Sequence, residues 1–131
     1  MKKSGILNRD ISAMLATLGH TDRFIIADCG LPIPRDVPCI DVSLKLGTPS
    51  FMSVLELIAE EIEIEKLTLA NEIITENSAL HLQLTKYYQR IPIDYISHGE
   101  LKEEIQKVKA VLRTGEATPF ANVIVHAGVV F

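Results

Sequence analysis

A short, unbroken apolar run constrains the fold of this 131-residue chain more than any other feature. Residues 24–27 read FIIA, and Asp28, Cys29 and Gly30 end the run abruptly. Consecutive apolar residues between polar boundaries are typical of a strand that is covered on both faces. In open α/β sheets, ligands bind beyond the carboxyl ends of such strands. The run therefore predicts a buried strand with Asp28 at a candidate site.

A helix is predicted before this strand, and it places a histidine near it. Asn8 is a good N-cap residue. The apolar side chains that follow recur at helical spacing: Ile11, Met14, Leu15 and Leu18. We expect Gly19 to end this helix in the left-handed conformation. His20 then occupies a defined corner of the fold, and together with Asp28 it indicates a functional site.

The rest of the chain alternates short strands with helices. Further strands are predicted at residues 39–44, 66–70, 93–96, 110–112 and 122–126. The segment 113–121 is too short for a helical crossover, so the last strand is expected to run antiparallel beside the strand before it. The pattern predicts an α/β fold in which residues 1–131 form one domain, with a mixed, mostly parallel sheet flanked by helices.

Composition narrows the classes of partner. The net charge is −4, and no basic cluster exists that could neutralise phosphates, so no nucleic-acid partner is expected. No apolar stretch approaches the roughly 18 residues of a membrane span, so no membrane partner is expected either. Residues 1–10 lack the apolar core of a secretion signal, which favours a cytoplasmic protein with Cys29 and Cys39 as free thiols.

Several polar residues are candidates for binding or catalysis. Ser97 and Glu100 match a capping box, which places His98 in the first turn of a helix, where the helix dipole favours a neutral imidazole. A plain surface histidine is an equally good interpretation. In the polar loop at residues 113–122, Asn122 is the best ligand candidate. No metal-ligand spacing and no phosphate-binding glycine motif occurs, so neither a metal nor a nucleotide site is predicted.

Six segments together resemble the ribose pyranase family of the pyranase and fucose mutarotase superfamily. They are GILN at 5–8, LGHTD at 18–22, ADCGLPIP at 27–34, SH at 97–98, RTGEATPFAN at 113–122 and the closing AGVVF. The GLPIP segment after the aspartate is similar to the ribose branch of that superfamily. The resemblance covers essentially the whole chain.

This resemblance implies a cofactor-independent isomerase, a D-ribose pyranase that interconverts the pyranose and furanose forms of D-ribose by acid/base ring opening. It makes His20 the catalytic proton donor. It also implies a set of residues that hold the sugar: Asp28, His98, Phe120, Ala121, Asn122 and, less strongly, Lys102. The family usually has tyrosine where this chain has Phe120, so one hydroxyl group is missing from the expected site. Members of the family form ring-shaped oligomers, commonly decamers, with sites near subunit boundaries.

Two other functions remain open at this point. The chain could be a cytoplasmic accessory protein of ribose uptake that binds the sugar without turnover, which the missing hydroxyl at Phe120 would fit. It could also be a fucose mutarotase. The three hypotheses differ in the sugar whose ring exchange the protein would accelerate: ribose, fucose or neither.

Overall fold

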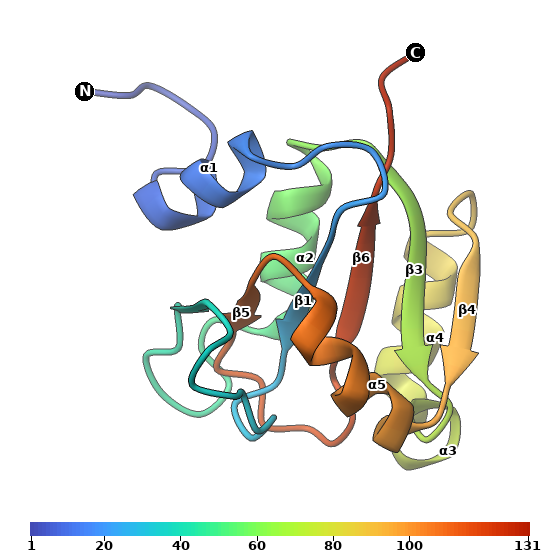
Figure 1. Cartoon of the computed structure of the whole chain (residues 1–131). Coiled ribbons are helices and arrows are strands. Elements are labelled where there is room, and N and C mark those ends of the chain that lie inside the picture. Colours follow the sequence, from blue (N-terminus) through green and yellow to red (C-terminus); the bar gives the residue numbers. More distant parts are fainter.

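Strand β1 (Arg23–Ala27) lies in the middle of the sheet in the computed structural model, which describes residues 1–131 (Figure 1). Residues 24–27 are all fully buried. Phe24 and Ile26 belong to one hydrophobic cluster, whereas Ile25 and Ala27 belong to another. Successive side chains of a strand point to opposite faces, so the FIIA run packs against both covering layers, as predicted.

The sheet has six strands in the order β2-β5-β1-β6-β3-β4. Strand β6 runs antiparallel to both of its neighbours, and every other pairing is parallel. The other elements are α1 (Arg9–Ala16), β2 (Cys39–Asp41), α2 (Phe51–Ala59), β3 (Ile64–Ala70), α3 (Ile73–Glu76), α4 (Ser78–Tyr87), β4 (Ile93–Ile96), α5 (His98–Glu104), a 3-10 turn (Ile105–Lys107), β5 (Val111–Arg113) and β6 (Val123–Ala127). The predicted α/β class and its mixed, mostly parallel sheet are confirmed.

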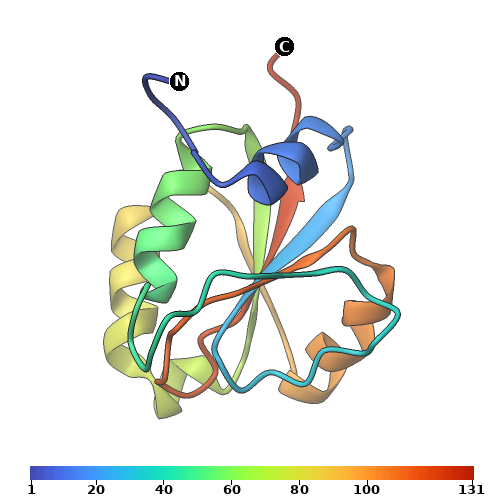
Figure 2. The ribbon, with the colours of Figure 1, turned by 90° about the vertical axis from the view of Figure 1, so that its left-hand side faces the viewer.

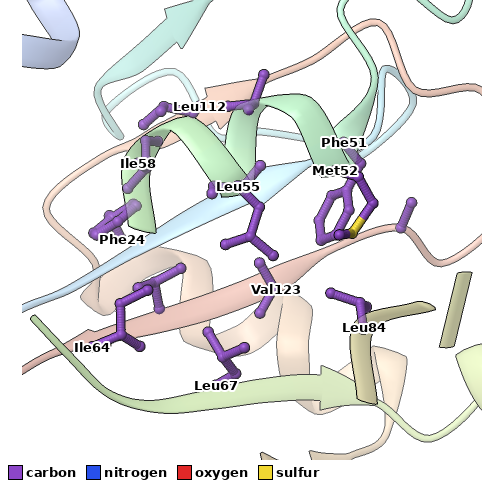
Figure 3. Packing of buried hydrophobic residues seen from close by; sticks show 14 of the residues in the cluster. Phe24, Phe51, Met52, Leu55, Ile58, Ile64, Leu67, Leu84, Leu112 and Val123 are labelled. Atoms are coloured by element: carbon purple, nitrogen blue, oxygen red, sulfur yellow. The ribbon is translucent and has the colours of Figure 1, made fainter. Parts of the chain in front are cut away.

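Helices cover the two faces of the sheet unequally (Figure 2). Helices α2 and α4 pack on one face, where Leu55 and Ile58 lie over Phe24 and Val123 (Figure 3). Helix α5 packs on the other face, where Leu101 joins the cluster around Ile25. Full burial of one such side chain is worth about 1.5–3 kcal/mol, so the larger cluster of 22 residues dominates the stability of the fold. No helix is both long and apolar enough to span a bilayer.

The prediction that the last strand lies beside the strand before it is wrong. Strand β6 pairs with β1 and β3, not with β5. Residues 123–125 are almost completely buried, and a position between two strands satisfies both backbone edges of such an apolar segment. The loop at 113–122 therefore crosses the carboxyl end of β1 to reach the far side of that strand.

The predicted end of the first helix is also wrong. Asn8 caps α1 as expected, but the helix ends at Ala16, and its C-cap Thr17 has a right-handed backbone. The left-handed residue is Thr21, with φ of 73°, rather than Gly19. The Asp22 carboxylate accepts a hydrogen bond from the Gly19 backbone N–H at 2.8 Å. This contact closes a tight turn at residues 19–22, and the left-handed residue therefore lies two positions after Gly19.

Candidate functional site

Asp28 lies directly after β1, and hydrogen bonds fix its carboxylate. One oxygen, Oδ1, accepts from the Gly30 backbone N–H at 2.9 Å. The other, Oδ2, accepts from the Asn122 amide at 2.8 Å. Asn122 Oδ1 in turn accepts from the Asp28 backbone N–H at 3.0 Å. Since a carboxylate oxygen has two lone pairs, both oxygens retain capacity for a ligand.

Asn122 is fully buried and lies just before β6. Both ends of its side chain are used on Asp28, 94 positions away in the sequence. Asn122, which was predicted to bind the ligand, therefore holds Asp28, a second predicted ligand-binding residue, in place. Its neighbour Ala121 is also fully buried, so its side chain belongs to the core and no atom of the residue is exposed within one chain.

Three hydrogen bonds hold the loop at 113–122 against the end of β1 and against the junction of α3 and α4. The fully buried Thr114 donates its hydroxyl to the Ala27 carbonyl at 2.7 Å. The Cys29 backbone N–H donates to the Glu116 carbonyl at 2.8 Å. Asn77 Nδ2, between α3 and α4, donates to the Pro119 carbonyl at 2.8 Å. These three contacts make the loop part of the rigid sheet edge.

Phe120 and His98 form the aromatic part of the site. Their rings meet edge to face, with centroids 5.1 Å apart. Phe120 has a left-handed backbone, with φ of 57°, which is uncommon outside glycine and marks a conformation imposed by the surrounding contacts. Its carbonyl accepts from the Asn122 backbone N–H, so one continuous set of contacts runs from Asp28 through Asn122 and Phe120 to His98.

His98 is held at the first turn of α5 as predicted. The capping box of Ser97 and Glu100 is present, and the His98 backbone N–H donates to the Glu72 carboxylate at 3.0 Å. The side-chain atom Nδ1 is buried and has no hydrogen-bond partner. Nε2 is therefore the ring nitrogen of His98 that is left to contact a ligand.

A cavity of about 430 Å³ opens beside Asp28. Residues 28–30 line it on one side, residues 116–119 line another, and Leu46 borders it. This size suits a small polar molecule. His98, Phe120 and Lys102 do not line the cavity. Lys102 is one turn beyond His98 on α5, and its ammonium group is exposed with no hydrogen bond or ion pair.

His20 lies far from all of these residues within one chain. It precedes the amino end of β1, whereas Asp28 follows the carboxyl end, and five extended residues span about 16 Å. In Figure 1, β1 runs from the end where α1 lies to the end where α5 lies. The His20 side chain is half-exposed, and its Nε2 lies 3.5 Å from the Glu65 carboxylate. The structure thus brings together Asp28, His98 and Asn122 but leaves His20 apart.

Sequence reasoning missed the residues that hold the site from a distance. Glu72 and Asn77 belong to no recognisable motif, and Glu116 lies in the RTGEATPFAN segment, where nothing marks its partner. Glu116 Oε2 accepts from the Phe51 backbone N–H at the start of α2, at 3.0 Å. No group of three or more His, Cys, Asp or Glu side chains is arranged to hold a metal ion.

Comparison with known proteins adds relatives over the full length. A D-ribose pyranase of Halalkalibacterium halodurans is 56% identical over 131 residues, covering all of both chains. A D-ribose pyranase of Bacillus cereus is 51% identical with the same coverage. The structure of Bacillus subtilis RbsD complexed with D-ribose matches with a TM-score of 0.96 at 47% identity, again over all of both chains.

More distant structures share the fold alone. The fucose mutarotase of Streptococcus pneumoniae in complex with L-fucose has a TM-score of 0.77 at 20% identity, covering 95% of both chains. The model of the RbsD / FucU transport protein family matches residues 1–130. The match of the family model and the full-length relatives lead to one conclusion: this chain belongs to the RbsD / FucU transport protein family.

Proposed function

We propose that this protein is a D-ribose pyranase, which interconverts the pyranose and furanose forms of D-ribose through the open-chain aldehyde. The observation that carries the proposal is the prepared carboxylate of Asp28, oriented by Asn122 beside a cavity of sugar size. Full-length similarity to relatives named D-ribose pyranase, and to a ribose-bound structure, supports the same substrate. The high sequence identity to these proteins favours ribose over fucose as the substrate.

The reaction needs two proton transfers and no other chemistry. A base removes the proton of the anomeric hydroxyl at C1, the bond between C1 and the ring oxygen O5 breaks, and an acid protonates O5. Closure on O4 reverses these steps and forms the furanose. Positioned proton transfer of this kind contributes about 10²–10⁴ in rate, and histidine suits it near neutral pH.

The residues divide this work by position. Asp28 accepts hydrogen bonds from sugar hydroxyls, and each such charge-assisted bond is worth about 1.5–3 kcal/mol. His98 contacts a sugar oxygen through Nε2, the nitrogen that is not buried without a partner, and Phe120 offers its ring as a surface for the apolar face of the sugar. Lys102 extends from the same helix as His98 and can reach a polar substituent. His20 is the proton donor.

His20 must come from a second copy of the chain. Within one chain about 16 Å of extended strand separates it from Asp28, which is too far for both to touch one sugar. When one surface of each copy supplies His20 and a different surface supplies Asp28, the contact joins two unlike surfaces. Contacts of this type form a ring when the rotation from one copy to the next closes on itself, and an open filament when it does not. The proposal includes a ring-shaped homo-oligomer, for which the resemblance to the family implies a decamer, and a cytoplasmic location.

Mixing two inactive variants tests this arrangement. His20→Ala and Asp28→Asn are each expected to lose accelerated exchange between the pyranose and furanose signals of D-ribose in saturation-transfer NMR. Mixed rings assembled from equal amounts of both variants contain about a quarter of sites with both native residues, and they should regain about that share of activity. If each site lay within one chain, mixing would restore nothing.

Ring exchange measured with the parental protein tests the proposed activity itself. Accelerated ribose exchange supports the enzyme, whereas binding without acceleration would establish the accessory sugar-binding protein instead. The same measurement with L-fucose separates ribose pyranase from fucose mutarotase. Light scattering on the native protein should give about ten times the mass of the chain, and a monomer would contradict a shared site.

A further inference from the structure

Two backbone irregularities face each other at the amino end of β1. The first is Thr21, a β-branched residue with a left-handed backbone. The second is a bulge in β3, because Ile64 pairs with Ala127 and Lys66 pairs with its neighbour His126, which leaves Glu65 without a partner on β6. Strain of this kind persists where the surrounding structure enforces it, and bulges re-aim side chains.

Both irregularities are anchored to the same residue of β6. The Thr21 backbone N–H donates to the Ala127 carbonyl at 3.2 Å, and the Ala127 backbone N–H donates to the Asp22 carbonyl at 2.9 Å. Ala127 is also the partner of Ile64, at the edge of the bulge. The turn that carries His20 and the bulge that carries Glu65 are therefore fixed relative to one another.

The turn around His20 is further tightened by Asp22. Its carboxylate accepts from the Gly19 backbone N–H at 2.8 Å and lies 3.4 Å from the Lys109 ammonium. The Gly19 hydrogen bond, followed by Lys109, lowers the pKa of the Asp22 carboxyl, so this side chain is ionised at neutral pH. The backbone on both sides of His20 is thus held in place before any partner arrives.

These contacts place the Glu65 carboxylate beside the His20 ring. His20 Nε2 lies 3.5 Å from Glu65 Oε2. The adjacent cation, Lys66, does not compete for this carboxylate, because its ammonium is paired with Asp94 at 2.8 Å. A carboxylate beside one imidazole nitrogen selects the tautomer, orients the ring and stabilises the positive charge that forms when the other nitrogen takes a proton.

We propose that Glu65 is the positioning residue of His20 and that it holds the ring with its hydrogen on Nε2, so that Nδ1 takes the proton of the anomeric hydroxyl and, from the resulting imidazolium, donates it to the ring oxygen O5. The inference rests on the proposed function, since it assigns a partner to the proposed proton donor. The contact at 3.5 Å is long for a hydrogen bond, and such contacts shorten when a substrate and a neighbouring subunit exclude water.

Kinetics of Glu65 variants in the assembled protein test the inference. Glu65→Gln should lower kcat for ribose ring exchange about tenfold and leave KM within about twofold, because Glu65 acts on the proton donor and does not touch the sugar. Glu65→Asp should recover part of kcat. Glu63→Gln is the matched control, since Glu63 is also exposed but has no side-chain contact with His20, and it should match the parent.

A second measurement keeps the test independent of activity. In the parent, ¹⁵N spectra of histidine-labelled protein, with His20→Ala for assignment, should show His20 protonated at Nε2, and Glu65→Gln should shift this balance. A parent without ring exchange would refute the proposed function. An active parent whose Glu65→Gln variant keeps kcat within twofold, or a His20 ring protonated at Nδ1, would overturn only the role of Glu65.

Discussion

The contact between Asp28 and Asn122 can be tested by changing a single atom. Asn122 is fully buried, and its Nδ2 donates to Asp28 Oδ2 at 2.8 Å. Asn122→Asp keeps the shape of the side chain but replaces this donor with a second carboxylate oxygen. The substitution therefore probes the hydrogen bond with almost no change in packing.

The size of the effect follows from the distance. Two carboxylates 2.8 Å apart repel one another by about 6 kcal/mol at an effective dielectric constant of ~20. The pair escapes the full repulsion by taking up one proton, which restores a hydrogen bond between the two groups. Protonating an aspartate of ordinary pKa costs about 4 kcal/mol at pH 7. We expect the free energy of unfolding to fall by about 2–4 kcal/mol at that pH.

The loss should depend on pH with a definite sign. In the folded variant the shared proton is bound more tightly than by an aspartate in the unfolded chain. The destabilisation is therefore complete at neutral pH and shrinks as the pH falls, because the unfolded chain then binds protons too. The cost of the proton falls to about 1.5 kcal/mol at pH 5.

Urea unfolding at pH 7 and pH 5 measures both effects. The protein concentration must be the same in every sample, because association shifts apparent stability. Asn71→Asp, an exposed position with the same change in charge, is the control and should leave the midpoint within about 0.5 kcal/mol of the parent. An Asn122→Asp variant as stable as the parent at pH 7, or equally destabilised at both pH values, would refute the reasoning.

Two further predictions concern the helix and the ring beside His98. Ser97→Ala removes the acceptor of the Glu100 backbone N–H, a contact of 3.1 Å, and should lower the free energy of unfolding by about 0.5–2 kcal/mol; an unchanged urea midpoint would contradict the role of the cap. Phe120→Tyr adds a hydroxyl to a half-buried ring at the candidate site, so ribose should bind about 0.5–1.5 kcal/mol more tightly in calorimetry with the stability unchanged. A destabilised variant with unchanged or weaker binding would remove Phe120 from the sugar.

Local features of the chain were predictable because they depend on neighbours in sequence. The run at 24–27 had to be covered on both faces, and the Ser97–Glu100 box needs only one helical turn. The same holds for Asn8 at the start of α1 and for Asp28 at the end of β1. The interpretation of the sequence placed His20 and Asp28 at one site, whereas the extended strand between them sets them about 16 Å apart within one chain.

Contacts between distant segments were decided by the tertiary structure. The loop at 113–122 is equally able to close a hairpin or to cross the end of β1, and only the burial of β6 between two strands selects the crossing. That choice brings Asn122 to Asp28. The left-handed Thr21 and the bulge at Glu65 likewise arise from pairing with β6. Sequence by itself determined which residues could be buried or capped, whereas the neighbours chosen by the whole core determined which polar groups meet.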